Sequence, residues 1–439
     1  MGAEAMQAER LCRWVTDARS RTLELVDDLS DEQLQGQPLA TVNPLLWEIG
    51  HVAWFQEKWV LRHFGRCQPL CAETDHLYDS AAIAHETRWD LPLFSRQKAW
   101  RYLADVHDRV LDLVASTTCD PKLSYFVKLS VFHEDMHAEA FTYMRQTLGF
   151  PPPPMAVRQL EEPQQAAAGS ADPDVEHPGG TFLLGSGRNE PFVFDNEKWA
   201  HPVQVKPFAI ARTPVTQFDF ARFVDDAGYQ RRGFWSDAGW QWRSDNHPLA
   251  PVYWQRDPAA QWLRRDYDRW VRLEPDRPVV HVNAFEAEAY CRWAGRRLAT
   301  EAEWELAAAA DIVSGAGLGQ GKRRYPWGNQ DPDPQRTNVD GYYGDPIGVH
   351  ALPAGDTPRG CRQMMGNVWE WTASDFGPYP GFVPDPYKEY SKPWFGTRRV
   401  LRGGCWATRA RLLRNTWRNF FPPDRRDLWA GFRTCRVDG

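Results

Sequence analysis

The first 150 residues carry a helical pattern of apolar side chains. Apolar residues recur at intervals of three and four, as they do on the buried face of an amphipathic helix. The stretches with this spacing are residues 5–29, 44–64, 95–115 and 122–148. Asn43 followed by Pro44 matches a helix N-cap with proline at the first helical position, and Ser30 matches the start of a short helix. The pattern predicts an antiparallel four-helix bundle over residues 1–150.

The pattern changes after residue 150. Residues 151–176 are rich in Pro, Gln, Ala and Glu, which indicates a linker. Over residues 177–439, Gly, Pro, Asn and Trp interrupt the short apolar runs. Helical spacing returns there only at residues 216–227, 284–294 and 300–309. We therefore predict an α+β multidomain chain with a loop-rich C-terminal domain, and its length of 439 residues agrees with two domains.

Composition and charge narrow the class of protein. The formal net charge of -6 gives no basic footprint for nucleic acid. No apolar run approaches the ~20 residues of a membrane helix, and residues 1–21 lack the apolar centre of a signal peptide. The 8 cysteines are spread along the chain, as is usual for free thiols in a reducing compartment. We expect a cytoplasmic protein that binds no membrane, as a monomer or a small homo-oligomer.

Three histidines are the strongest candidates for chemistry. His133 and His137 are four residues apart, so a helix places both imidazoles on one face, where they can bind one metal ion. His51 lies in the second predicted helix and can supply a third nitrogen. Three imidazoles leave coordination positions open, as catalytic metal sites do. The alternative is that these are ordinary core or solvated histidines, and physical chemistry alone accepts zinc as readily as iron.

A series of short blocks carries a family resemblance. They include Gly-Asn-Val-Trp-Glu-Trp at residues 366–371 and Arg-Gly-Gly at residues 402–404. The full series is residues 177–185, 211–216, 278–283, 297–304, 325–329, 365–372, 402–406 and 430–433. In this order they resemble the blocks of the formylglycine-generating-enzyme (sulfatase-modifying-factor) fold, which is C-type-lectin-like. The first 150 residues resemble a DinB-like four-helix bundle, and the pair of domains resembles the ergothioneine-type sulfoxide synthases.

The resemblance implies a non-haem iron enzyme. Such enzymes use O2 to join a chalcogen donor to C2 of the imidazole of hercynine, the trimethylated histidine. His51, His133 and His137 match the three ligands of Fe(II) in this family. Tyr379 matches the region of an active-site tyrosine that donates a proton in the reaction. Because DinB-like thiol transferases use a similar triad with zinc, iron is inferred from the pairing of the two domains.

The resemblance also points to substrate residues. Asn419 and Phe420 match an Asn-aromatic pair that touches hercynine, since an amide suits a carboxylate and an aromatic face suits a quaternary ammonium. Without the family, ordinary core packing would be the simpler interpretation of Phe420 and Phe421. We also assign Arg88 and Met136 to the substrate-binding set.

Two departures from the mycobacterial-type enzymes concern the donor. Phe421 stands where those enzymes have an Asp that binds the amine of γ-glutamylcysteine, and Arg88 stands alone where they have an Arg pair. The helix that carries His51 looks most like the branch that contains the selenoneine synthases. That branch joins hercynine to a selenosugar, 1-seleno-N-acetylglucosamine, as a selenoxide. The alternative is a hercynine sulfoxide synthase of the ergothioneine pathway that uses cysteine or γ-glutamylcysteine.

Two other classes of function are less well supported. A copper-dependent formylglycine-generating enzyme needs two cysteines in the block after Arg-Gly-Gly, and residues 406–411 contain none. A binding module without chemistry predicts a degraded histidine triad, whereas all three histidines are present. The expected partners are therefore small molecules, namely hercynine, the selenosugar and O2. A structural Ca2+ in the C-terminal domain is left open.

Overall fold

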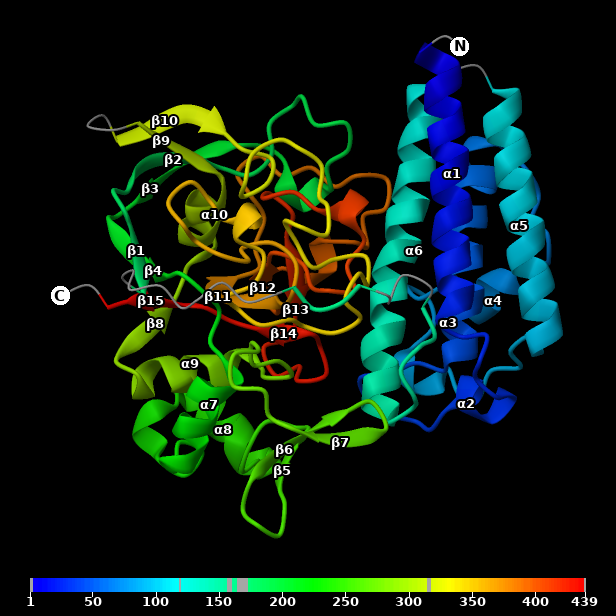
Figure 1. Ribbon diagram of the computed structural model, residues 1–439. Helices are drawn as coiled ribbons and strands as arrows, with labels where there is room; N and C mark the ends of the chain where they lie inside the picture. Colours follow the sequence, from blue (N-terminus) through cyan, green and yellow to red (C-terminus); the bar gives the residue numbers. More distant parts are fainter. Residues whose placement is uncertain (1–2, 118–119, 156–159, 164–172, 314–316, 438–439) are drawn as a thin grey trace. The chain divides into compact units, whose positions relative to one another are not determined.

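A computed structural model describes residues 3–117, 120–155, 160–163, 173–313 and 317–437. The chain divides into two compact units, Met1–Ala156 and Val157–Gly439. Of the predicted linker, residues 156–159 and 164–172 lie outside the described residues. The first unit is helical, and the second combines short strands with helices (Figure 1).

Four long helices lie side by side in the first unit (Figure 1). They are α1 (Ala3–Glu24), α3 (Leu45–Gln56), α5 (Arg96–Ser116) and α6 (Pro121–Leu148). The shorter elements are α2 (Asp31–Gln35), α4 (Thr74–Tyr78) and a 3-10 turn at His85–Thr87. The predicted helices are therefore confirmed. Their apolar spacing is the cause, since α5 buries Val106, Val110 and Val114 at intervals of four residues.

The starts of α2 and α3 were both predicted from capping patterns in the sequence. Ser30 caps α2 through a capping box with Gln33, as predicted. The predicted Asn43 cap was wrong, because Pro44 occupies the N-cap position of α3 and the Asn43 side chain donates to Glu48 instead. Beyond Gln56, α3 continues as a π-helix over Glu57–Phe64, a form that often occurs near functional sites.

The second unit is built on two four-stranded sheets. The first has the order β1 (Asp174–His177), β4 (Phe208–Ala211), β15 (Thr434–Arg436) and β8 (Arg296–Leu298). The second has the order β13 (Asn419–Phe421), β12 (Arg399–Arg402), β11 (Trp369–Asp375) and β14 (Ala430–Gly431). Two smaller sheets have two strands each: β2 (Gly180–Leu184) pairs with β3 (His201–Val205), and β9 (Ala310–Val313) pairs with β10 (Gly317–Lys322). A third small sheet has three strands, in the order β5 (Trp254–Arg256), β6 (Trp262–Asp266) and β7 (Arg269–Arg272). Thus β13 is an edge strand.

Capping boxes start three helices of this unit. These helices are α7 (Gln217–Asp225), α9 (Ala284–Trp293) and α10 (Glu301–Ala309), capped by Thr216, Asn283 and Thr300. The structure adds α8 (Asp237–Asn246), which the sequence pattern did not predict. Only Gly239 of α8 is buried, so this helix has no apolar stripe to reveal it. Short 3-10 turns occupy Asp195–Glu197, Arg232–Phe234, Pro353–Gly355, Lys392–Trp394 and Ala410–Leu412.

Aromatic side chains and buried ion pairs fill the interior of the second unit. Trp304, Trp369 and Trp371 are fully buried. The indole N–H of Trp304 donates to Glu370, which is also paired with Arg433. Buried polar groups of this kind need partners, and Glu370 supplies one to both Trp304 and Arg433. Tryptophan side chains thus form part of the core of this unit.

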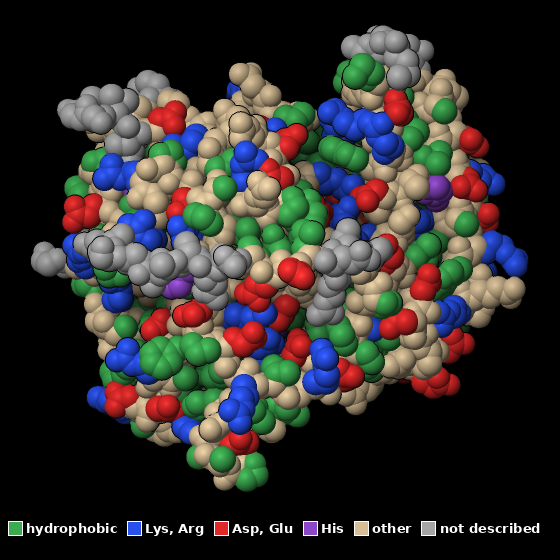
Figure 2. All heavy atoms as spheres, in the orientation of Figure 1, with side chains coloured by type: hydrophobic (Ala, Val, Ile, Leu, Met, Phe, Trp, Pro, Cys, Tyr) green, Lys and Arg blue, Asp and Glu red, His purple; other side chains and the backbone are tan. Residues whose placement is uncertain are grey.

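The surface carries charges of both signs. Figure 2 shows lysine and arginine side chains interspersed with aspartate and glutamate on the face in view, with no extended basic patch among its described residues. None of the helices in the described residues is long and apolar enough to cross a membrane. The surface thus agrees with the charge balance of the sequence.

Candidate metal centre

The three predicted histidines come together inside the first unit. His51 lies on α3, and His133 and His137 lie one turn apart on α6. One ligand atom from each residue lies within 4.8 Å of the others. The Nε2 atoms of His133 and His137 are 3.2 Å apart. Two helices therefore bring three imidazoles to one point, as the spacing predicted.

The surroundings of two rings leave Nε2 facing this point. The Nδ1 atom of His51 lies 2.8 Å from the backbone carbonyl of Tyr78. The Nδ1 atom of His137 lies 2.6 Å from a carboxylate oxygen of Glu48. Gly50 permits the first contact, because a Cβ at this position would lie 2.2 Å from the Tyr78 ring. A proton held on Nδ1 by such an acceptor leaves Nε2 as the lone-pair donor.

Ring stacking fixes the same histidines from the side. The His51 ring stacks on Trp47 at 4.7 Å with an interplanar angle of 10°. The His133 ring stacks on Phe55 at 3.6 Å with an angle of 5°. Because these neighbours are buried, the ligand rings have little freedom to rotate. The centre is preorganised by the packing of α3 against α6.

Burial keeps two of the three imidazoles, those of His51 and His133, neutral. It lowers the pKa of His51 to about 3 and that of His133 well below its usual range, and the neighbouring His137 adds to both shifts. Burial alone would raise the pKa of Glu48, but the adjacent His137 holds it at about 2. Metal binding needs neutral imidazoles, so the centre requires no loss of protons from His51 or His133 near neutral pH.

This donor set fits a divalent transition metal. Three neutral nitrogens converge, and one buried carboxylate supplies a compensating charge behind His137. The His137 side chain is 21% exposed, so the centre is not sealed from solvent within this unit. A site with three protein ligands and solvent access keeps coordination positions open, which is the arrangement of a catalytic metal site.

Two predicted substrate residues lie near this centre. Arg88 is buried, with its guanidinium 3.9 Å above the Trp47 ring and donating to Asn43 and to the carbonyl of Ile83. Met136 is half-buried on α6, directly before His137. Met136 thus adjoins His137 in the chain, and the guanidinium of Arg88 is engaged in contacts within the bundle.

The predicted hercynine residues lie on the edge strand β13 of the second unit. Asn419, Phe420 and Phe421 are all half-buried. The Phe420 ring stacks on Phe376 at 4.0 Å, and the backbone N–H of Phe420 donates to the Asn419 side-chain oxygen. Within the described part of the chain, the Asn419 amide nitrogen has no hydrogen-bond acceptor. That N–H2 group is therefore available to a ligand.

Each of the two units matches a known protein family. Residues 15–141 match the DinB superfamily, and residues 159–437 match the sulfatase-modifying factor enzyme 1-like domain. The chain is 39% identical to the hercynine oxygenase of Mycolicibacterium thermoresistibile, over 98% of this chain and 96% of that protein. The chain belongs to the hercynine oxygenase family. It is accordingly an oxygenase, and the predicted pairing of a DinB-like bundle with a formylglycine-generating-enzyme-like domain is confirmed.

Two further relatives place the family in context. The hercynine oxygenase of Mycobacterium tuberculosis is 39% identical, over 97% of this chain and 98% of that protein. The formylglycine-generating enzyme of Thermomonospora curvata is 34% identical, over 63% of this chain and 95% of that protein. The two hercynine oxygenases match the chain over both units, so the helical unit with the histidines belongs to the resemblance.

The catalytic assignment of Tyr379 stays a prediction for this hercynine oxygenase homologue. The Tyr379 ring is buried in the core of the second unit, 4.6 Å from the His201 ring and 4.1 Å from the guanidinium of Arg418. Burial raises the pKa of its phenol well above 10, so the group stays protonated near neutral pH and its O–H can donate a hydrogen bond.

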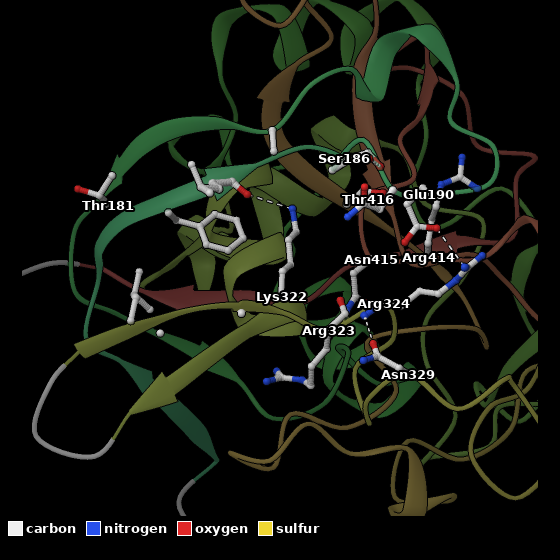
Figure 3. A pocket seen from close by; sticks show the side chains of 18 residues that line it. Thr181, Ser186, Glu190, Lys322, Arg323, Arg324, Asn329, Arg414, Asn415 and Thr416 are labelled. Carbon is white, nitrogen blue, oxygen red and sulfur yellow. Dashed lines mark hydrogen bonds and ion pairs between the residues drawn. The ribbon is translucent and has the colours of Figure 1, made fainter.

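The second unit of this family member also contains a cavity of about 690 Å³. Figure 3 shows Lys322, Arg323, Arg324 and Arg414 among its lining residues. Each of these cations has a carboxylate partner, namely Glu305, Asp311, Glu190 and Glu197 respectively. The cavity therefore has no uncompensated positive charge to select an anion.

The sequence analysis missed Glu48, Asn43 and Trp47 around the metal centre. Glu48 is an acid within an otherwise apolar helix, three residues before His51, and this was the available signal. A charged residue on a buried helix face needs a partner, and its position one turn before a ligand points to the metal centre.

Proposed function

We propose that this enzyme joins C2 of the hercynine imidazole to the selenium of a 1-selenosugar, 1-seleno-N-acetylglucosamine, to give a selenoxide. The carbon and the selenol each lose one hydrogen, O2 supplies the selenoxide oxygen, and its second oxygen leaves as water. The observation that carries the oxidative part is the preorganised three-histidine centre. The hercynine oxygenase relatives support hercynine as the acceptor.

We assign Fe(II) to the centre because the reaction consumes O2, and bound iron supplies the redox chemistry that zinc lacks. His51, His133 and His137 would hold it through Nε2, with Glu48 fixing the tautomer of His137. The amide of Asn419 pairs with the hercynine carboxylate, and the aromatic ring of Phe420 suits the quaternary ammonium. These residues bind and orient the acceptor.

The donor assignment rests on missing charge. Phe421 offers an apolar ring where an acid would hold an amine, and the guanidinium of Arg425 lies 5.3 Å from the centre of this ring. The guanidinium of Arg88 is engaged with Asn43 and Trp47 in the bundle. A neutral sugar needs no such pairing, whereas the two carboxylates of γ-glutamylcysteine do. The alternative is a sulfoxide synthase that uses cysteine or γ-glutamylcysteine, and the name of the relatives, hercynine oxygenase, does not distinguish the two donors.

A competition assay tests the donor. Purified enzyme with Fe(II), O2 and hercynine should convert the 1-selenosugar faster than cysteine or γ-glutamylcysteine by a factor on the order of 100 or more, because an unpaired carboxylate on entering the site costs a few kcal/mol. Mass spectrometry of the mixed reaction measures the products. Dominant cysteine or γ-glutamylcysteine adducts would instead assign the enzyme to sulfoxide synthesis.

Replacing Asn419 with alanine tests the acceptor. The variant loses the amide that pairs with the hercynine carboxylate, so the apparent affinity for hercynine should fall by roughly ten-fold or more. Steady-state kinetics at saturating donor measures this change. Asn246→Ala, which removes an exposed amide on α8, is the matched control. An unchanged hercynine KM in Asn419→Ala would place the acceptor elsewhere.

A further inference from the structure

A chain of contacts leads away from two of the metal ligands and closes on one side chain, Arg88. One arm starts at His137, whose Nδ1 contacts Glu48 at 2.6 Å, and continues to Asn43, which donates to the other Glu48 oxygen at 2.5 Å. Arg88 completes this arm, because its Nη1 donates to the Asn43 oxygen at 2.8 Å.

The other arm runs through stacked rings. His51 stacks on Trp47, and Arg88 lies over the same indole at 3.9 Å. The indole N–H of Trp47 donates to the carbonyl of Leu77 at 2.7 Å, which holds the ring in place. Arg88 itself is anchored by the carbonyl of Ile83. A single guanidinium thus contacts both supports, the amide behind His137 and the ring beside His51.

Because these groups are buried, the loss of one contact cannot be compensated by water. Glu48 is 3% exposed and Arg88 is 8% exposed, so neither group has water to replace a lost partner. Asn43 cannot rotate without breaking a bond at each end, since its nitrogen faces Glu48 and its oxygen faces Arg88. An imidazole whose second nitrogen contacts a carboxylate is a more basic metal ligand with a fixed ring orientation.

We propose that Glu48 is a positioning residue for the metal ligand His137, and that Arg88 acts through Asn43 and Trp47 to hold Glu48 and His51 in place. This inference rests on the proposed metal centre and gives Arg88 a role other than substrate binding. The two roles differ in one measurable respect. A positioning role changes metal affinity when no substrate is present, whereas a donor-binding role changes only the KM for the donor.

Metal titration without substrate tests the inference. Co(II) binding to the full-length apo-protein, followed by its visible absorption and by competition with a chelator, reports both affinity and ligand geometry. We expect Glu48→Ala to weaken Co(II) binding by about 10- to 100-fold with an altered spectrum, and Glu48→Gln to recover part of the loss because its amide oxygen can still accept from Nδ1. Arg88→Ala should weaken binding with a spectral change in the same direction.

Two further variants control for folding. Glu57→Gln alters a fully buried carboxylate that follows Glu48 on the same run of helix but contacts Tyr102 and Leu70, and it should leave Co(II) affinity unchanged. Arg88→Lys keeps a cation over Trp47 without the fork that reaches Asn43 and Ile83, so it should lie between wild type and Arg88→Ala. Circular dichroism and thermal melting confirm that each variant is folded.

The outcomes separate this inference from the proposed function. Wild-type affinity and spectrum in folded Glu48→Ala and Arg88→Ala would overturn the positioning role. An Arg88→Ala variant that binds Co(II) normally but has a raised donor KM would return Arg88 to substrate binding. Failure of the wild-type protein to bind one Co(II) or Fe(II) per chain would instead overturn the metal centre itself.

Discussion

Replacing His137 with alanine is expected to remove most of the iron and nearly all turnover. The variant leaves two imidazoles, and the buried carboxylate of Glu48 keeps Asn43 but loses its contact with His137. Loss of an outer partner of a ligand already costs up to ~100-fold in affinity or activity, and loss of the ligand itself should cost more. Metal analysis after anaerobic reconstitution should give about one iron per chain for the wild type, as one three-histidine centre requires.

The control is a histidine of the same bundle outside the centre. His107→Ala removes an imidazole on α5 that contacts Thr16 and Asp108, and it should keep full iron content. Full iron content and turnover in His137→Ala would show that the three histidines are not the metal ligands. Stoichiometric zinc without iron, with activity retained, would support the metal centre but contradict the choice of metal.

Replacing Glu301 with alanine is expected to destabilise the second unit strongly. Glu301 accepts from Arg402 at 2.9 Å and from Arg418 at 2.7 Å, and all three side chains are buried. Without the carboxylate, two buried guanidinium groups lose their shared partner, and breaking a buried pair costs about 3–5 kcal/mol. The unit should melt roughly 10 °C lower, as measured by scanning calorimetry.

The same substitution tests the support of the proposed substrate strand. Arg418 directly precedes Asn419 and also donates to the carbonyls of Asn196 and Gly377, so it fixes the start of β13. Hercynine affinity should therefore fall along with stability. Arg231→Ala, which breaks an exposed pair with Asp226, should change the melting temperature by about 1–2 °C at most. Equal melting temperatures for the two variants would contradict the proposed contribution of the buried ion pairs of Glu301 to stability.

The sequence predicted those parts of the molecule that depend on local spacing. The helices of the bundle follow apolar repeats of three and four, and the capping boxes at Ser30 and Thr300 follow from neighbouring residues. The His133 and His137 pair needed only the period of one helix, whereas His51 was added as a third candidate because the second predicted helix carries it. Apart from His51, each of these features involves contacts within a few residues, so the local sequence carries the information.

The errors have equally physical causes. Asn43 is a residue type that often caps helices, and it lies at the expected position. Its side-chain amide instead contacts Glu48 and Arg88, because a hydrogen bond to a buried charged group is stronger than one to a backbone N–H. α8 has a capping serine at Ser236 but buries only Gly239, so no apolar period indicates it. For Asn43, the tertiary contact with Arg88 overrides the local capping pattern. For α8, few residues are buried, so the sequence has no apolar pattern that would predict the helix.

The sequence by itself determined that two domains exist, which residues are candidate metal ligands and which family they resemble. The tertiary structure decided the rest, because it brings together groups distant in the chain. Glu48 meets His137 across 89 positions of sequence only when α3 packs against α6, and Glu301 meets Arg402 and Arg418 only in the folded core. Partners of this kind are chosen by burial and charge, since a buried ionic group is tolerated only where the fold supplies its counterpart.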